Sequence, residues 1–164
     1  MNDTLRICNC MKHDVVFTTK DTTIREAATL MVERSVGTLP IVDKTGILVG
    51  VTTMRDIIQV FLPNFVSLVS DIDFVIDYGD LGQLTPESQE KANNLSVAEL
   101  MDEAVAVEVD SSLIRALSIM HKHHIRDLPV LENGRLVGIA SRVDIGRAFL
   151  AEWLSSMAEA LEDE

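Results

Sequence analysis

One short pattern occurs twice in this chain, and this repetition limits the possible folds more than any other feature. Leu-Pro, two aliphatic residues and an acidic residue stand at 39–43 and again at 128–132, and both copies continue through a glycine-containing turn into Leu-Val-Gly. The prolines are 129 − 40 = 89 residues apart, and the last shared aspartates are 144 − 56 = 88 apart, because the second turn is one residue shorter. Other pairs 89 residues apart are Asp21 and Asp110, Ala27 and Ala116, Leu30 and Ile119, and Met31 and Met120. The spacing indicates one supersecondary unit present twice, whose copies bury their apolar faces together.

The composition limits the class of protein and its partners. The 164 residues suffice for one domain or for two small halves that share a core, and 47% of them are apolar. The net charge of −12 would repel the phosphates of nucleic acid, so we exclude a nucleic-acid partner. No apolar run reaches the ~18 residues of a membrane span, and charged residues interrupt the first twenty positions, where a signal peptide would be apolar. We therefore expect a cytoplasmic protein without membrane contact.

Each copy predicts the order β-α-β-β-α, and hence an α/β (α+β) fold. The first copy predicts a strand at 14–18, a helix from about 23, strands at 39–42 and 47–51, and a second helix from about 53 to Pro63. Thr23 and Glu26 have the spacing of a capping box at the start of the first helix. The second copy predicts a strand at 105–109, a helix over 112–123, strands at 128–131 and 136–140, and a long helix from 141 onward.

The segment between the copies has no counterpart. Apolar residues from Phe65 to Ile76 keep helical spacing opposite a row of aspartates, which predicts an extra helix, and the composition of 79–94 predicts a loop. We divide the chain into a first repeat at 1–62, a helical acidic insert and connection at 63–95, and a second repeat with an extended C-terminal helix at 96–164.

The C-terminal helix carries a wide apolar stripe. Its members are Ile145, Phe149, Trp153, Met157 and Leu161, with Leu150 and Leu154 beside them. A stripe of this width needs a partner, either the core of the same chain or another molecule.

Each predicted hairpin ends in Gly-h-x-(Thr/Ser)-x-x-Asp, where h is aliphatic. The hydroxyl groups of Thr53 and Ser141 fall at helix starts, where free backbone N–H groups suit a phosphate. Asp56 and Asp144 follow one turn later, where a carboxylate suits the diol of a ribose. Alternatively, the hydroxyl groups are simple N-caps and the carboxylates favour the helix dipole. One copy alone would favour caps, whereas two copies in register favour a nucleotide site.

These repeated motifs resemble the cystathionine-β-synthase (CBS) domain, which occurs as tandem pairs. The resemblance covers residues 11–57 and 100–146 and rests on the Leu-Pro pattern, the Leu-Val-Gly strand, the Gly-h-x-(Thr/Ser)-x-x-Asp ending and the strand-helix opening. It implies two repeats related by a pseudo-twofold axis and a disc-like homodimer. It also implies two clefts between the repeats that bind AMP, ADP, ATP or S-adenosylmethionine.

The resemblance further implies which residues line these clefts, because sites of this family combine both repeats. The first cleft would comprise Val16, Val36, Gly37, Thr38, Ser141, Arg142 and Asp144. The second cleft would comprise Val105, Ile125, Arg126, Asp127, Thr53, Arg55 and Asp56. Aliphatic side chains would flank adenine, the aspartate would hold the ribose, and the hydroxyl with a nearby arginine would meet phosphate. Because the second cleft offers Arg55 and Arg126, we expect it to favour phosphate, although Asp127 could cancel one of these charges.

Metal binding and catalysis have little support in the sequence. His121 and His124 lie one turn apart on their predicted helix while His123 points elsewhere, so at most two imidazoles converge, fewer than a structural zinc site needs. Cys8 and Cys10 are too close for an ordinary disulfide, and inert thiols are the simpler interpretation. The chain has no Walker loop, dinucleotide fingerprint or nucleophile motif. We predict no metal, no cofactor and no enzymatic activity.

We interpret the chain as a stand-alone regulatory module for energy sensing, whose adenosine-containing ligand alters its homodimer or an unknown target protein. A ligand that touches both repeats shifts their relative angle only by binding one arrangement better than another. The C-terminal helix and the extra helix after Pro63 would report that shift. The alternative is a ligand-free dimeric scaffold that docks partner proteins through its acidic insert and tail, and a third is a metal-responsive regulator that uses the histidines.

Overall fold

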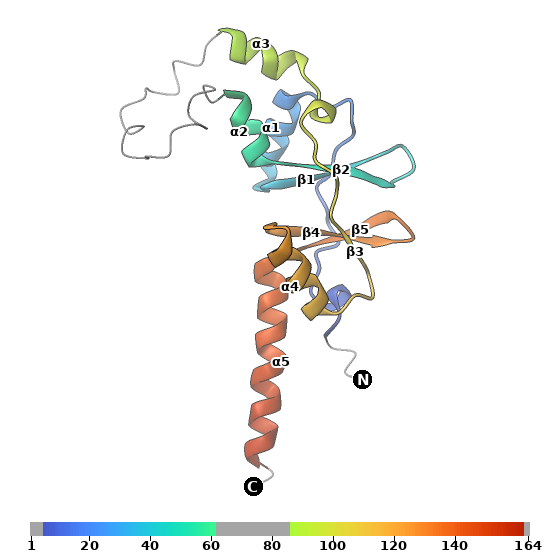
Figure 1. Cartoon of the computed structure of the whole chain (residues 1–164), viewed down its shortest axis with the longest axis vertical. Helices are drawn as coiled ribbons and strands as arrows, with labels where there is room; N and C mark the ends of the chain where they lie inside the picture. Colours follow the sequence, from blue (N-terminus) through green and yellow to red (C-terminus); the bar gives the residue numbers. More distant parts are fainter. Residues whose placement is uncertain (1–4, 62–85, 163–164) are drawn as a thin grey trace, which may run out of the picture.

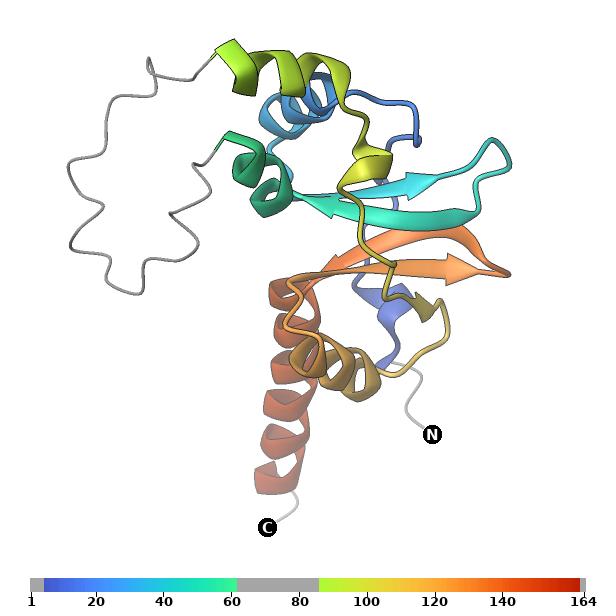
Figure 2. The same ribbon diagram turned by 45° about the horizontal axis from the view of Figure 1, so that its top comes forward.

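The two copies of the sequence pattern fold into two similar halves that face each other. A computed structural model describes residues 5–61 and 86–162. Two small β-sheets lie face to face, and helices cover the outer face of each sheet (Figures 1 and 2). The first half consists of α1 (Ile24–Arg34), β1 (Thr38–Val42), β2 (Leu48–Thr53) and α2 (Met54–Phe61). The second consists of β3 (Val107–Glu108), α4 (Leu113–Lys122), β4 (Asp127–Glu132), β5 (Arg135–Ser141) and α5 (Arg142–Glu162). The predicted α+β fold with a duplicated unit is confirmed.

Both hairpins have the predicted antiparallel pairing, and each buries one face. In the first half, β1 pairs with β2 and buries Leu39 and Ile41 against α1. In the second half, β4 pairs with β5, and Leu128 and Val130 occupy the equivalent places. The predicted capping box starts α1, since the Thr23 side chain accepts from the Glu26 backbone N–H and the Glu26 carboxylate accepts from the Thr23 N–H at 2.8 Å.

The predicted strand at 14–18 is reduced to a single parallel bridge between Thr18 and Ile41. The Thr18 N–H donates to the carbonyl of Pro40, and the Val42 N–H donates to the carbonyl of Thr18. The ladder does not extend further back because the chain before it pairs with the other sheet, where Lys12 and Ile139 exchange two backbone hydrogen bonds of 2.8 and 3.0 Å. The matching strand of the second half, β3, has two residues and runs parallel to β4.

The prediction of a loop over 79–94 is wrong for its last nine residues, which form α3 (Pro86–Asn94). Pro86 occupies the first helical position, where its missing N–H costs nothing, and Glu87 pairs with Lys91 one turn later at 2.9 Å. Ala92 is buried against the first-half core. A polar helix with one buried alanine gives almost no periodic signal in the sequence. The predicted helix between Phe65 and Ile76, and the end of α2 at Pro63, lie outside the described residues.

The two halves exchange their opening turns. The short 3-10 turn at Ile7–Asn9 packs into the core of the second half through Ile7 and Met11, although it precedes the first. The equivalent turn at Val97–Glu99 packs into the first-half core in the same way. In Figure 1 the N-terminal segment accordingly runs down to the second sheet. Because of this exchange, each sheet packs against apolar side chains that come from the segment before the other half in the sequence.

The contacts between the halves follow the pseudo-twofold relation that the repeat implies. At the hairpin tips, the Leu48 N–H donates to the carbonyl of Gly134, and the Leu136 N–H donates to the carbonyl of Gly46. Each residue of one bond is 88 positions from its counterpart in the other, since 136 − 48 and 134 − 46 both equal 88. The halves therefore meet along equivalent edges.

The exchanged turns should make two glycines essential to stability. A Cβ at Gly138 would lie 2.5 Å from the Met11 sulfur and 3.2 Å from the carbonyl oxygen of Lys12. We expect Gly138→Ala to lower the free energy of unfolding by about 1 to 3 kcal/mol because of this overlap, as measured by urea denaturation. Gly50, which faces Met101 in the same way, should behave alike.

Two further variants separate overlap from other effects. A Cβ at Gly37 would meet no described atom within 4 Å beyond its own chain neighbours, so Gly37→Ala should change stability by less than about 0.5 kcal/mol. Adding Met11→Ala to Gly138→Ala should cost less than the sum of the two single changes, because the methionine is what the new methyl group meets. If the stability losses of the two single changes were strictly additive, the contact with Met11 would not require a glycine at position 138.

Candidate functional site

Four side chains form a row where the hairpins of the two halves meet. Thr38 lies opposite Thr53 in the first sheet, and Asp127 lies opposite Ser141 in the second. The row is joined at its centre, where the Thr38 hydroxyl donates to Oδ2 of Asp127 at 2.8 Å. Thr38 and Asp127 occupy equivalent repeat positions, since 127 − 38 = 89. Predicted residues of both clefts are thus brought together at the strand ends.

The two hydroxyl–carboxylate motifs adopt the same local geometry. The Thr53 hydroxyl donates to Oδ2 of Asp56 at 2.6 Å, and the Ser141 hydroxyl donates to Oδ2 of Asp144 at the same distance. The backbone N–H groups of Thr53 and Ser141 also donate to these oxygens. All four of these bonds use Oδ2. The N-cap of the alternative interpretation is formed in the second motif, where the Asp144 N–H donates to the Ser141 hydroxyl at 3.1 Å. Within the described part of the chain, no hydrogen bond reaches Oδ1 of either aspartate, although Nε of Arg55 forms an ion pair with Oδ1 of Asp56 at 3.8 Å.

The electrostatic surroundings differ between the motifs. Burial by itself would raise the pKa of Asp144, but hydrogen bonds from Ser141 and the ammonium group of Lys12, 3.6 Å away, outweigh it and lower that pKa. Burial, with help from Asp144 and Cys8, raises the pKa of the Cys10 thiol. A raised pKa keeps the thiol protonated at neutral pH, which agrees with an inert cysteine.

The sequence predicts Arg55, Arg126 and Arg142 near the phosphate of a ligand, but the structure gives these side chains other surroundings. The guanidinium of Arg142 donates to the carbonyls of Met120 and Ile125, both at 3.0 Å, and so closes the end of α4. The Arg55 side chain is 78% exposed, with Nε 3.8 Å from Oδ1 of Asp56. Arg126 is exposed, and its carbonyl accepts from the Arg142 N–H. Arg142 is thus engaged within its own half.

The predicted adenine-flanking residues lie beside the cores of their own halves. Val16 and Val36 are half-buried against the first core, and Val105 and Ile125 are half-buried against the second. Gly37 is exposed, and its carbonyl accepts from the Met54 N–H at 2.8 Å. Among the described residues, no hydrogen bond or ion pair links these five residues to the hydroxyl–carboxylate motif of the opposite half.

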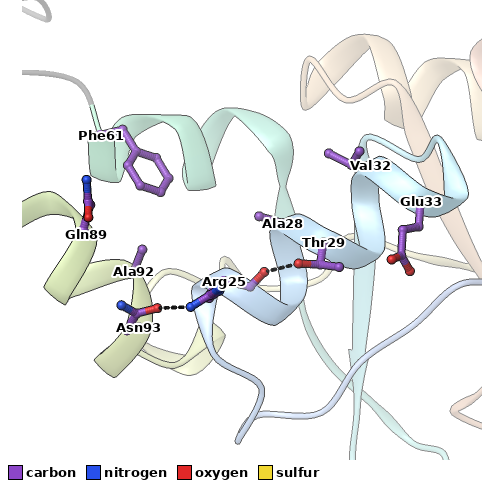
Figure 3. Close-up of a pocket in the computed structure, with 9 residues that line it drawn as sticks. All are labelled: Arg25, Ala28, Thr29, Val32, Glu33, Phe61, Gln89, Ala92 and Asn93. Carbon is purple, nitrogen blue, oxygen red and sulfur yellow. Dashed lines mark hydrogen bonds between the residues drawn. The ribbon is translucent and has the colours of Figure 1, made fainter. Parts of the chain in front are cut away.

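Two cavities lie elsewhere and contain none of the predicted site residues. The larger, about 590 Å³, is a groove between α1, α2 and α3, lined by Arg25, Ala28, Thr29, Val32, Glu33, Phe61, Gln89, Ala92 and Asn93 (Figure 3). Arg25 donates to the side chain of Asn93 across this groove at 3.3 Å. No sequence signal marks the groove, because the composition of its third wall, α3, is typical of a loop. The smaller, about 560 Å³, lies at the hairpin tips and is lined in part by Phe17, Lys44 and Leu136.

The metal alternative depends on histidines that cluster only partly. His121 and His124 have ring centroids 6.4 Å apart. The prediction that one helix carries both is wrong, because α4 ends at Lys122 and His124 has a positive φ of 55°. No group of three or more metal-ligating side chains occurs in the part of the chain that the structure covers. In the same described residues, no helix is long and apolar enough to cross a membrane.

Comparison with known proteins identifies the fold family. The CBS domain profile matches residues 7–63 and 97–151. Protein YlbB of Bacillus subtilis is 30% identical over 161 residues, which cover 96% of this chain and 90% of that protein. CBSX2 of Arabidopsis thaliana, solved in complex with AMP, has a TM-score of 0.66 at 24% identity. The match covers 89% of this chain and 96% of the CBSX2 chain.

A second structure has a different ligand on the same fold. The CBS domain pair of protein MJ0100, solved with 5′-methylthioadenosine and S-adenosylmethionine, has a TM-score of 0.65 at 23% identity. The match covers 90% of this chain and 97% of the MJ0100 chain. With the profile matching both repeats and the fold matching solved CBS pairs, this chain belongs to the CBS domain family.

Proposed function

We propose that this chain is a regulatory module that binds an adenosine-containing ligand between its two repeats. The observation that carries the proposal is the duplicated hydroxyl–carboxylate pair, Thr53 with Asp56 and Ser141 with Asp144, at the ends of facing hairpins. In each pair one carboxylate oxygen is held by the cap and the other has no hydrogen bond from the described residues. A fixed carboxylate of this kind suits the two hydroxyl groups of a ribose.

The ligands of related structures support this chemistry. CBSX2 was solved with AMP, and MJ0100 with 5′-methylthioadenosine and S-adenosylmethionine. All three contain adenosine, so the ribose and the adenine are the shared features. In this chain, Val16 and Val36 would flank adenine in one cleft, and Val105 and Ile125 would flank it in the other. Thr38 and Gly37 would then lie near the remaining parts of the ligand.

The same proposal includes how the ligand acts. Because the two repeats contribute to each cleft, a ligand that prefers one relative arrangement shifts the population toward it. We propose that a homodimer or a target protein in the cytoplasm reads this shift through α5, and that the module catalyses no reaction. The division at 1–62, 63–95 and 96–164 belongs to this proposal.

One observation favours the scaffold alternative. The groove between α1, α2 and α3 is open and carries the apolar side chains of Phe61, Val32 and Ala28 (Figure 3). An open apolar groove on the outer face suits a partner protein better than a ligand between the repeats. A chain that binds partners there and no adenosine compound would be a scaffold.

Substitution of the two aspartates tests the ligand proposal. Asp56→Ala and Asp144→Ala should each weaken binding in one cleft by roughly 1.5 to 3 kcal/mol, since a charged hydrogen bond to the ribose is lost. Isothermal titration calorimetry with AMP and with S-adenosylmethionine measures this loss. Asp56→Asn and Asp144→Asn are the matched controls for stability, because the amide oxygen can still accept from the N–H of Thr53 or Ser141 while the charge is removed.

The variants also distinguish a binding role from capping alone. If the aspartates are only caps, the alanine variants should lose roughly 1 kcal/mol of stability and retain wild-type affinity. Equal and small losses of affinity in both alanine variants would contradict the ligand role of both residues.

A further inference from the structure

A carboxylate occupies the meeting point of the two halves. Asp127 begins β4, and its Oδ2 accepts the hydroxyl of Thr38 from the facing sheet at 2.8 Å. Both side chains are partly buried. Because Thr38 lies opposite Thr53 in its sheet, the side chains of Thr38 and Thr53 emerge on the same face, and Asp127 lies on that side of the first hairpin. Asp127 therefore lies against Thr38 on the face of the first hairpin that also carries Thr53, whose hydroxyl would meet the 5′ end of a ligand.

Among the described residues, no cation neutralises this carboxylate through an ion pair. Arg142 is engaged by two backbone carbonyls, and Lys12 lies 3.6 Å from Asp144. The neighbour of Asp127, Arg126, is exposed, and Arg55 is 78% exposed beside Asp56. The proposed second cleft would thus have two carboxylates, Asp56 and Asp127, at its polar end. Its two arginines are exposed, where their charge is largely screened.

We propose that Asp127 makes the second cleft select adenosine ligands with a cationic or neutral 5′ substituent, such as a sulfonium or a thioether, over 5′-phosphates. This inference rests on the proposed function. A phosphate would carry two negative charges toward a partly buried carboxylate, whereas a sulfonium would be attracted by it. The sequence alone favours phosphate in this cleft because it places two arginines there. The side-chain positions favour the opposite preference.

Three ligands that share adenosine test the inference, namely AMP, 5′-methylthioadenosine and S-adenosylmethionine. Their 5′ substituents are anionic, neutral and cationic, so differences in affinity report charge at that end. Calorimetric titration of the Asp144→Ala variant, in which the first cleft is weakened, should give a dissociation constant for S-adenosylmethionine at least about fivefold below that for AMP. Asp127→Asn should tighten AMP binding by about five- to tenfold, weaken S-adenosylmethionine by a similar factor, and leave 5′-methylthioadenosine within about twofold.

The amide retains an oxygen that accepts from Thr38, so the contact between the halves is kept. Thr38→Val removes the hydrogen bond but keeps the carboxylate, and should preserve the wild-type order of affinities. Asp110→Asn removes the same unit of charge from an exposed turn and should change all three affinities by less than about twofold. An effect of Thr38→Val equal to that of Asp127→Asn would assign the preference to the contact and overturn the role of charge.

The outcomes separate this inference from the function on which it rests. If 5′-methylthioadenosine binds but Asp127→Asn changes the ratio of the AMP and S-adenosylmethionine constants by less than twofold, the site stands and the role of Asp127 is wrong. Tighter binding of AMP than of S-adenosylmethionine by the Asp144→Ala variant would also overturn it. If none of the three ligands binds at millimolar concentration, the ligand site itself is wrong and the selectivity is lost with it.

Discussion

Adenosine-containing ligands should raise the melting temperature of this chain by roughly 5 to 10 °C at concentrations near 100 times the dissociation constant. That excess stabilises the folded state by about 2.7 kcal/mol, provided that the unfolded chain does not bind. We expect this condition to hold because each proposed cleft combines residues from both repeats, which are at least 105 − 56 = 49 positions apart in the sequence. Differential scanning calorimetry with AMP, ATP, 5′-methylthioadenosine and S-adenosylmethionine measures the shift.

Nucleotides with other bases are the control for this result. GMP and CMP should give much smaller shifts, because the backbone of the cleft would read the edge of adenine while the ribose and phosphate are unchanged. A shift of equal size with GMP would indicate binding through phosphate and ribose only. A transition that no adenosine compound moves at millimolar concentration would contradict the regulatory proposal and favour the scaffold.

The duplicated unit was predictable because its signals are local. Thr23 and Glu26 are three residues apart, and the capping box that they form is present. The turn at 43–46 joins two β-branched runs, and the antiparallel pairing of β1 with β2 follows. Contacts of this short range depend on few residues, so the pattern of one copy sufficed and the second copy confirmed it.

The exchange of opening turns was not predictable from the same signals. Ile7 and Met11 give an apolar pattern that fits either core, and nothing within a few residues tells which half receives them. The choice depends on the long-range pairing of Lys12 with Ile139 and on the space that Gly138 leaves for Met11. The helix α3 was not predictable for a related reason, since Ala92 alone marks its buried face.

The candidate site was only partly predictable. The motif places Thr53, Asp56, Ser141 and Asp144 at helix starts, and the structure forms both pairs there. The motif does not show the direction of long side chains, because these depend on distant acceptors. Its spacing predicts Arg142 at phosphate, whereas the guanidinium binds the carbonyls of Met120 and Ile125. The sequence pairs Asp127 with its neighbour Arg126, whereas its hydroxyl partner is Thr38, 89 residues away.

The C-terminal half of α5 is the part of the structure that most needs a partner. Ile145 is buried and Phe149 is half-buried against the second core, so the first turns of α5 pack within the same chain. Beyond them the helix extends away from the body (Figures 1 and 2). There Leu150, Trp153, Leu154 and Met157 are 48% to 60% exposed. A soluble chain seldom leaves four large apolar side chains together in water.

We therefore predict a homodimer in which α5 contributes Trp153 and Leu154 to the contact. The double change Trp153→Ser and Leu154→Ser should weaken dimerisation about 100-fold or more, because large buried apolar residues dominate such interfaces. Sedimentation equilibrium measures the dissociation constant. Both side chains are more than half exposed, so the melting temperature extrapolated to the monomer should stay nearly constant.

Charge and salt give a second test of the same contact. The chain carries a net charge of −12, which opposes the approach of two copies, so dimerisation should tighten as salt screens the repulsion. A matched change on the first half, Val32→Ser, removes an apolar side chain that is 74% exposed but lies on α1. If Val32→Ser weakens the dimer as much as the double change on α5, the outer face of the first half belongs to the interface. If the intact chain sediments as a monomer at micromolar concentration, the prediction of a homodimer through α5 is wrong.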